Sequence, residues 1–153
     1  MEFGVREGTT IEQFLKYNPA VNIHGFDSWE GLPEDWDVGN KIYQPGDMAV
    51  PMPEFDSRVE LWRGWFEDTI DPWKNTHDGP IQLLHVDGDL YSSAKTVLTK
   101  LNDRIVPGTV IIFDEIRHVI GNKKGIFVAK RNFLNCSFLM NSKQFQVHLD
   151  LHH

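Results

Sequence analysis

The sequence predicts an α/β fold, in which a doubly wound and mostly parallel sheet ends in an antiparallel strand. One observation is that strand-like apolar runs alternate with helix-like segments through most of the chain. A second is that only a short turn separates the last two strand-like runs, residues 137–140 and 144–151. A third is that two inner apolar runs end in acidic residues, as buried strands do when they present side chains at the carboxyl edge of an open sheet.

The first half of the chain is expected to supply three strands and one helix. Residues 1–5 and 21–26 have strand-like patterns, and residues 11–17 between them carry apolar side chains at helical spacing. Residues 29–56 contain four prolines and three glycines, which break any regular period. We expect this segment to be either a lid over a site or an ordered surface excursion. A third strand is expected over residues 59–63.

The second half is expected to begin with a loop over residues 72–80 and to continue with two buried strands. The first of these strands starts at Leu83, and the second covers residues 110–113. A helix is expected between them over residues 94–103, because apolar side chains recur there at the spacing i, i+3, i+4 and i+7. A weaker helical pattern over residues 126–134 precedes the terminal hairpin.

Composition and charge indicate one globular domain over residues 1–153 and exclude some classes of partner. The net charge of −7 argues against nucleic-acid binding, which needs a basic face. No apolar run has the length of a membrane span, and the start lacks a signal-peptide pattern, so no membrane partner is expected. The single cysteine, Cys136, cannot form an internal disulfide, which favours a reducing compartment and hence the cytoplasm.

Four carboxylates follow the two buried strands of the second half. Asp87 and Asp89 are two residues apart and share a face if the strand is regular, while Asp114 and Glu115 follow the next strand. Four acids on adjacent strand ends repel one another unless a cation lies between them, and oxygen ligands suit Mg²⁺. The alternative is helix capping by Asp89 and Asp114 beside a solvated turn. The histidines are dispersed along the sequence, so no zinc site is predicted.

A loop with the pattern acid-x-Gly-x-x-x-Gly joins the first strand to the first helix and contains Glu2, Gly4 and Gly8. Glycines let a ligand approach the backbone, and free N–H groups at a helix start can bind it. Asp27 ends the second strand, where an acid accepts hydrogen bonds from ribose hydroxyls. Together these features favour a nucleoside ligand; the alternatives are a plain tight turn and a turn-stabilising aspartate. The sequence has no G-x-x-x-x-G-K-[ST] loop, which argues against a nucleoside triphosphate.

Five stretches of the sequence resemble one enzyme family in collinear order, from residue 2 to residue 115. They are E-F-G-V-R-E-G-T-T-I, G-F-D-S-W-E-G-L-P-E-D-W, G-W-F-E-D-T-I, H-V-D-G-D-L-Y-S-S-A-K-T-V-L and R-I-V-P-G-T-V-I-I-F-D-E. Each stretch alone is short, but their combination is specific. The chain resembles the metal-dependent S-adenosylmethionine O-methyltransferases of the macrocin type, a family that includes enzymes methylating sugars on macrolide and aminocoumarin antibiotics.

The resemblance implies a Rossmann-like class I methyltransferase fold with a seven-stranded sheet. It also implies a magnesium-dependent enzyme that transfers a methyl group from S-adenosylmethionine to a hydroxyl of a sugar or another vicinal-diol small molecule. By resemblance, the methionine part of the cofactor is held by Glu2, Gly4, Gly8 and Thr10, the ribose by Asp27 with Ser28 beside it, and the adenine lies near Trp65 and Phe66. By the same resemblance, Mg²⁺ is held by Asp87, Asp114 and Glu115, and Asp89 is the general base.

Two departures from the family pattern qualify these expectations. Family members carry sequence ahead of the first strand, whereas Met1 stands almost within it, so the N-terminal part is expected to be shortened. Cover for the site would then be missing or would come from a partner copy in a homo-oligomer. The residues that follow Glu115 also differ from the family pattern, which leaves the acceptor open. The alternative to an enzyme is a truncated, non-catalytic domain that serves as a binding or assembly module.

Overall fold

A computed structural model of the chain describes residues 1–114 and, for the backbone, residues 125–130, 135–140 and 143–147. In chain order the elements are β1 (Glu2–Phe3), α1 (Thr9–Tyr17), β2 (Ile23–Asp27), β3 (Trp36–Asp37), β4 (Ile42–Tyr43), β5 (Val59–Arg63), α2 (Phe66–Thr76), β6 (Leu83–Val86), α3 (Tyr91–Lys100), a 3₁₀ turn (Asn102–Arg104), β7 (Val110–Phe113), β8 (Gly125–Lys130), β9 (Asn135–Met140) and β10 (Lys143–Val147). The predicted magnesium ligand Glu115 lies outside the described residues.

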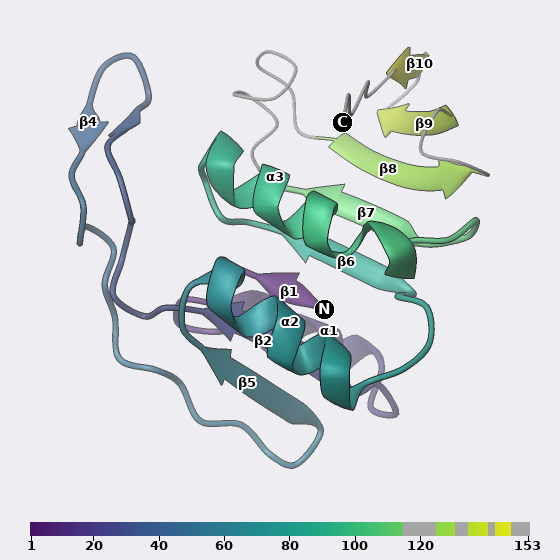
Figure 1. Cartoon of the computed structure of the whole chain (residues 1–153), viewed down its shortest axis with the longest axis horizontal. Coiled ribbons are helices and arrows are strands. Elements are labelled where there is room, and N and C mark those ends of the chain that lie inside the picture. Colours follow the sequence, from purple (N-terminus) through teal and green to yellow (C-terminus); the bar gives the residue numbers. More distant parts are fainter. Residues whose placement is uncertain (115–124, 131–134, 141–142, 148–153) are drawn as a thin grey trace.

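Eight strands form one sheet in the order β10-β9-β8-β7-β6-β1-β2-β5 (Figure 1). The five strands from β7 to β5 in that order run parallel to their neighbours, and β8, β9 and β10 extend the sheet beyond β7 in antiparallel pairs. This arrangement confirms the predicted doubly wound, mostly parallel class. It differs in detail from the prediction, because there are eight strands rather than seven and three antiparallel strands rather than one.

The helix expected over residues 126–134 is wrong, since β8 (Gly125–Lys130) occupies most of that segment. The sequence G-I-F-V-A-K contains β-branched and aromatic residues, which suit a strand. A short apolar run has no period that separates strand from helix, so pairing with β7 decides the conformation.

The order in which the strands are added reverses at β1. The chain builds β2 and β5 on one side of β1 and then returns to add β6 and β7 on the other side. The register pairs Glu2 with His85 and Phe3 with Val86, so the residues that follow β1 and β6 emerge side by side. Ligands of open α/β sheets bind in the crevice that such a reversal leaves at the carboxyl edge.

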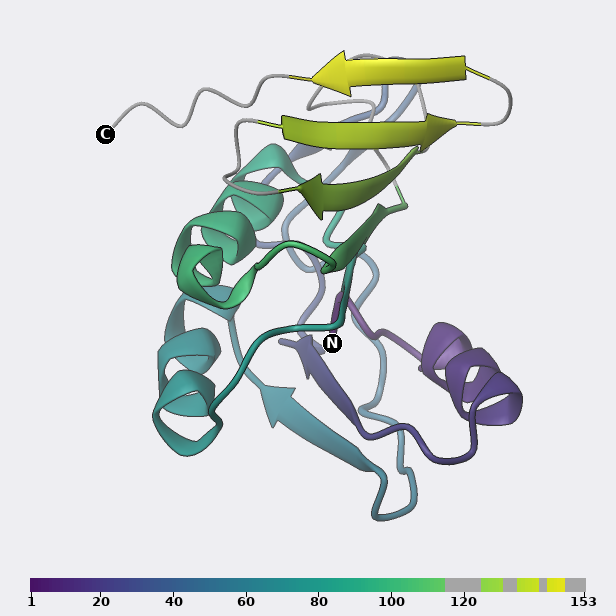
Figure 2. The same cartoon turned by 90° about the vertical axis from the view of Figure 1, so that its right-hand side faces the viewer.

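The helices cover both faces of the sheet. Figure 2 shows α1 on one face and α2 with α3 on the other. Beneath α2 and α3, the larger hydrophobic core includes the fully buried side chains of Phe3, Phe26, Ile70, Leu84 and Val97. A smaller cluster around Ile11, Val5, Ile23 and Trp29 lies on the α1 side. No helix in the described part of the chain combines the length and the apolar character that a membrane crossing requires.

Helical spacing predicted α3, whereas the helix α2 was not predicted from the sequence. The predicted apolar positions of α3, namely Ala94, Val97, Leu98 and Leu101, are all buried. Helix α2 runs through Pro72, where a loop was expected. Pro72 is exposed, whereas Ile70 and Trp73 on the same helix are buried in the core. Packing of that inner face therefore outweighs the hydrogen bond that the proline removes.

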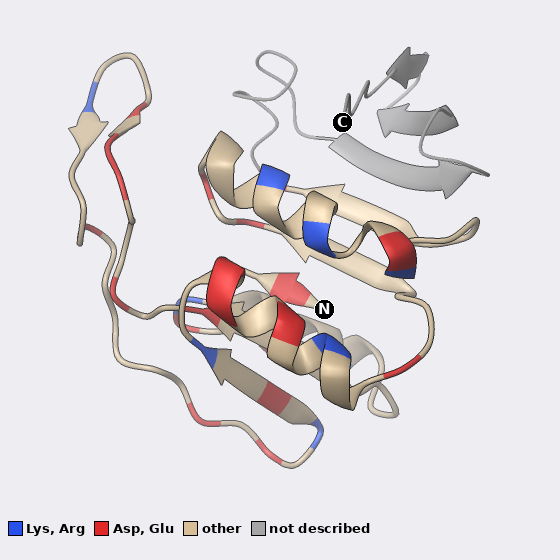
Figure 3. Ribbon diagram, in the orientation of Figure 1, with Lys and Arg blue, Asp and Glu red and all other residues tan. Residues whose placement is uncertain are grey.

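Residues 29–56 form an ordered excursion in which β3 and β4 pair as a separate two-stranded sheet, extending away from the main sheet (Figure 1). Leu32 and Trp36 of this excursion are buried in a cluster with Leu90, which precedes α3. Acidic side chains occur along the excursion and on α2, as the red segments of Figure 3 show. The excursion is therefore anchored beside the carboxyl edge of the sheet rather than detached from it.

Candidate active site

A cavity of about 840 Å³ opens at the reversal point of the sheet, within the range of small-molecule sites. Its wall combines the loop after β1, the end of β2, the excursion, the start of α2 and the segments that follow β6 and β7. Nine of the twelve predicted site residues line it: Gly4, Thr10, Asp27, Ser28, Trp65, Phe66, Asp87, Asp89 and Asp114. The fold thus brings together residues that stand more than a hundred positions apart in the sequence.

Glu2 is a predicted cofactor ligand that does not line the cavity. Its side chain is buried in the sheet, and its Oε1 lies 3.0 Å from Nδ1 of His85. Burial disfavours the charged imidazole, but the hydrogen bond to Glu2 and nearby acidic charges outweigh it and raise the pKa of His85. His85 is therefore a buried histidine whose hydrogen-bonding partner is Glu2.

The two glycines of the first loop shape the site in different ways. Gly4 has a φ of +93°, and a Cβ there would collide with the carbonyl oxygen of Asp87. Only glycine therefore allows the loop to pass so close to the end of β6. Gly8, with a φ of +86°, precedes the first turn of α1, and a Cβ on it would collide with the ring of Phe55. Gly8 does not line the cavity, so it supports the loop rather than the cavity wall.

Asp27 has the structural role that the sequence left as an alternative, and it also faces the cavity. Its two carboxylate oxygens accept hydrogen bonds at 2.8 Å from the backbone N–H groups of Arg6 and Trp29. The indole N–H of Trp29 in turn donates to the carbonyl oxygen of Arg6 at 2.9 Å. Asp27 thus ties the first loop to the end of β2, and each oxygen retains a second lone pair for a ligand.

Asp87, Asp89 and Asp114 crowd one part of the cavity wall. Asp87 follows β6 and Asp114 follows β7, and the pairing of Val86 with Phe113 sets the two aspartates beside each other. Burial and the charge of Asp114 raise the pKa of Asp87 to about 7; the charge of Asp89 contributes, and His85 opposes the shift. Asp89 has a φ of +58°, a left-handed conformation uncommon for a residue with a side chain and frequent at functional sites.

The donor chemistry of this part of the wall fits a magnesium ion. Mg²⁺ is usually held by one or two carboxylates, while water and substrate oxygens complete its coordination. Asp87 and Asp114 supply two carboxylates on adjacent strand ends. In the described part of the chain, these aspartates do not form a set of three donors within 4.8 Å of one another.

The excursion supplies cavity residues that the sequence did not single out. Tyr43 and Trp36 both line the cavity and stack on each other, with ring centroids 5.3 Å apart. Nζ of Lys41 lies 3.8 Å from the centroid of the Tyr43 ring. The hydroxyl of Ser92, at the start of α3, donates to Oε1 of Glu34 at 2.5 Å and links the excursion to the main domain. A tryptophan in a loop, as at Trp36, is the one signal for these residues that the sequence contains, and Tyr43 has no such signal.

Comparisons with known proteins agree with this architecture. The chain is 31% identical over 106 residues to the 8-demethyl-8-(2,3-dimethoxy-alpha-L-rhamnosyl)-tetracenomycin-C 4'-O-methyltransferase of Streptomyces olivaceus. That alignment covers 58% of this chain and 40% of the relative, so the chain spans about two fifths of the relative's length.

Two solved structures share the fold. The crystal structure of CalS11, a calicheamicin methyltransferase, superposes with a TM-score of 0.63 at 22% identity, covering 98% of this chain and 71% of that one. The O-methyltransferase NovP superposes with a TM-score of 0.54 at 22% identity, covering 86% of this chain and 67% of that one. Residues 1–116 also match the family described as "Methyltransferase domain". Because this match covers more than half of the 153 residues, the chain belongs to the methyltransferase domain family.

Proposed function

We propose that residues 1–153 are a single S-adenosylmethionine-dependent, magnesium-dependent O-methyltransferase domain. In this proposal it methylates a hydroxyl of a sugar or of another vicinal-diol small molecule. One observation carries the proposal: the carboxylates of Asp87 and Asp114 share a cavity with the glycine loop and Asp27 in a chain of the methyltransferase family.

The cavity wall offers a group for each part of the cofactor. Gly4 lines the cavity where its loop passes the end of β6, and Thr10 lies in the first turn of α1, where backbone N–H groups are free to bind a carboxylate. Asp27 has lone pairs available for the ribose hydroxyls. Trp65 and Phe66 offer ring faces for the adenine. The aspartates suit the positive charge of the sulfonium.

Asp87 and Asp114 would hold the magnesium ion. Mg²⁺ bound there would lower the pKa of the acceptor hydroxyl and orient it. Asp89 would accept the proton that the acceptor hydroxyl loses. The hydroxyl oxygen would take the methyl group from the sulfonium, and the electrons of the broken C–S bond would remain on sulfur. The backbone of Asp89 has a left-handed conformation next to these ligands. Such a conformation is frequent at functional sites, which supports a catalytic position for Asp89 over a place in a solvated turn.

Two features support a sugar-like acceptor. The relative in Streptomyces olivaceus is named for methylation of a rhamnosyl group, and CalS11 is also described as a TDP-rhamnose 3'-O-methyltransferase. The stacked rings of Trp36 and Tyr43 line the cavity on the excursion. Aromatic rings of this kind pack against the C–H faces of sugar rings, whose hydroxyls remain free to reach polar groups.

Isothermal titration with S-adenosylhomocysteine, with and without MgCl₂, tests the proposal first. We expect one binding site per chain and methyl transfer to a nucleotide-activated or free deoxysugar only when Mg²⁺ is present. Absence of binding in both titrations would overturn the cofactor proposal. Binding without turnover across a panel of vicinal diols would instead favour the non-catalytic alternative. Asp78→Asn is a suitable control for later variants, because Asp78 is fully exposed and does not line the cavity.

A further inference from the structure

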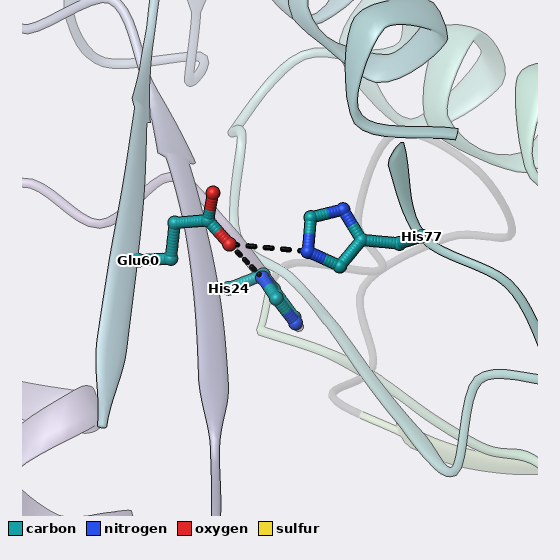
Figure 4. Close-up of side chains that lie close together, drawn as sticks. All are labelled: His24, Glu60 and His77. Atoms are coloured by element: carbon teal, nitrogen blue, oxygen red, sulfur yellow. Dashed lines mark ion pairs between the residues drawn. The ribbon is translucent and has the colours of Figure 1, made fainter. Parts of the chain in front are cut away.

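Three side chains from separate parts of the chain meet at the amino edge of the sheet (Figure 4). His24 lies on β2, Glu60 on the neighbouring β5, and His77 directly after α2. The strand register pairs His24 with Glu60, so the sheet itself sets these two side chains beside each other. Oε2 of Glu60 lies 3.1 Å from Nδ1 of His24 and 3.2 Å from Nε2 of His77. Donor atoms of all three residues lie within 4.8 Å of one another.

The hydrogen bonds of His77 direct its other nitrogen at the carboxylate. Nδ1 of His77 lies 3.1 Å from the carbonyl oxygen of Trp73. A carbonyl only accepts, so Nδ1 carries the proton and, in the neutral ring, Nε2 keeps the lone pair that faces Glu60. A second proton, on Nε2, would satisfy only the contact between His77 and Glu60. A cation among the three side chains would satisfy both imidazoles and the carboxylate together.

His24 contributes a second nitrogen without a hydrogen bond. Its Nδ1 is buried and lies at ion-pair distance from Glu60, yet it has no hydrogen-bond partner among the described residues. In a neutral imidazole one ring nitrogen keeps a lone pair that can bind a cation. The buried indole nitrogens of Trp62 and Trp73 also lack partners within the described residues, and both rings contact His77.

The donor set selects a transition metal rather than magnesium. Two imidazoles and one carboxylate are a ligand combination of zinc sites that keep a fourth position open. Ligands at the zinc bond length in a tetrahedral arrangement lie roughly 3.3 Å apart, close to the two short separations from Glu60. The hydrogen bond from His77 to Trp73 fixes that ring as outer partners of zinc-bound histidines do. The Glu60 side chain is 49% exposed, which gives an ion access from solvent.

We propose that His24, Glu60 and His77 bind one zinc ion, with a water molecule as the fourth ligand. The ion would join β2, β5 and the end of α2, three segments that no covalent bond links at this edge. This site is separate from the proposed magnesium site, because none of its three residues lines the active-site cavity.

Zinc titration of the full chain tests the proposal. The protein is stripped with a chelator, transferred to buffer with excess MgCl₂ to occupy the carboxylate site, and titrated with ZnCl₂ in a calorimeter. We expect one ion per chain, and a rise in Tm of roughly 5 to 10 °C when free zinc exceeds its Kd a hundredfold. The terminal His152-His153 pair is a separate source of imidazole. The variant His152→Ala/His153→Ala should therefore keep the same stoichiometry and Tm shift.

Substitutions in the cluster provide the second arm. His77→Gln and Glu60→Gln should each weaken zinc binding at least tenfold and remove the Tm shift. Glu12→Gln, at an exposed position on α1, should leave both unchanged. Unchanged far-UV circular dichroism and S-adenosylhomocysteine affinity show that the variants are folded. Absence of zinc binding by the stripped full chain would overturn the proposal, and so would equal binding by His77→Gln. Either result leaves the proposed methyl transfer untouched.

Discussion

The two edges of the sheet carry side chains that suit different cations. At the carboxyl edge, three aspartates offer only oxygen atoms and share one cavity with the glycine loop. At the amino edge, two imidazoles meet one carboxylate. Strand β2 serves both edges, since Asp27 ends it at the cavity and His24 stands three residues earlier, roughly 10 Å away along the strand. One short strand therefore joins the two proposed sites, whose donor atoms suit different cations.

The charges at the two edges also differ. Burial and neighbouring carboxylates raise the pKa of Asp87 to about 7, so the aspartates at the carboxyl edge repel one another when no ligand is bound. At the amino edge, burial and a neighbouring imidazole lower the pKa of His24. Crowding of the carboxylates lowers the stability of the first edge, whereas the imidazole of His24 at the second edge can be buried without charge. This difference leads us to expect the largest effects on activity at the carboxyl edge.

Asp89→Asn should have the largest effect of the changes considered. Loss of the proposed general base should reduce kcat by about 10² to 10⁴-fold, because the asparagine amide cannot take the hydroxyl proton. The affinity for S-adenosylhomocysteine should stay within about twofold, since the variant keeps the size of the side chain. Single-turnover kinetics and calorimetry measure the two quantities. An equal loss of both would contradict the role of base, and Asp78→Asn, at an exposed position near the amino edge, should change neither.

Gly4→Ala should have the next largest effect. The left-handed backbone at Gly4 alone should cost an alanine about 1 to 3 kcal/mol, and the collision with the carbonyl oxygen of Asp87 should add to it. Gly39→Ala is a matched control, because Gly39 has a φ of +90° but open space around it. The free energy of unfolding from urea titration should fall further for Gly4→Ala than for Gly39→Ala. Equal losses of the free energy of unfolding in the two variants would show that the close approach of the loop to β6 does not contribute to the cost of Gly4→Ala.

The grouping of residues at the carboxyl edge could be predicted from the sequence because each group directly follows a strand-like run. Asp87 and Asp89 directly follow an apolar strand, and glycines follow the first strand, so each group carries a local pattern. Parallel strands end at the same edge, and chain order alone therefore predicts that these groups meet. Glu2 illustrates the limit, because the pattern did not reveal that its side chain turns toward His85 in the sheet.

The amino edge could not be predicted because its residues have no shared local pattern. His24, Glu60 and His77 come from three elements, and only the pairing of β2 with β5 and the end point of α2 bring them together. A loop was expected over residues 72–80, so the helix that ends beside the sheet and places His77 there was not predicted. Tertiary packing overrode that local signal. His24 and His77 are therefore far apart in the sequence but lie close together in the folded chain.

In the metal-free chain, Asp87 at the carboxyl edge should make its own contribution to the pH dependence of the free energy of unfolding. Folded Asp87 keeps its proton up to about pH 7, whereas the unfolded residue loses it near pH 4. Between these values the folded state binds more protons, so the contribution of Asp87 makes the free energy of unfolding fall as pH rises. Asp87→Asn should remove this fall and stabilise the metal-free chain at pH 8 by about 1 to 3 kcal/mol.

Urea titrations in EDTA at pH 4, 6 and 8 measure this effect. The variant and the natural chain should have similar stability at pH 4, where folded Asp87 is protonated and the unfolded residue is still about half protonated. Asp71→Asn is a control with an exposed aspartate, and it should not change the slope between pH 6 and pH 8. A parallel decline of Asp87→Asn and the natural chain over that range would show that charge crowding at this edge is not the cause.

Tyr43→Leu should have the smallest effect, and it tests whether the excursion belongs to the carboxyl-edge site. Leucine removes the ring that stacks on Trp36 while keeping an apolar side chain, so the packing of the excursion should survive. If the Tyr43 ring contacts the acceptor, the KM of the variant for the acceptor should rise about three- to tenfold, while kcat and the affinity for S-adenosylhomocysteine stay the same. Tyr17→Leu replaces a tyrosine that is 80% exposed on α1 and should leave all three unchanged. An unchanged KM for Tyr43→Leu would show that the excursion has only a structural role. A parallel rise in the cofactor Kd would show that Tyr43 contacts the cofactor rather than the acceptor.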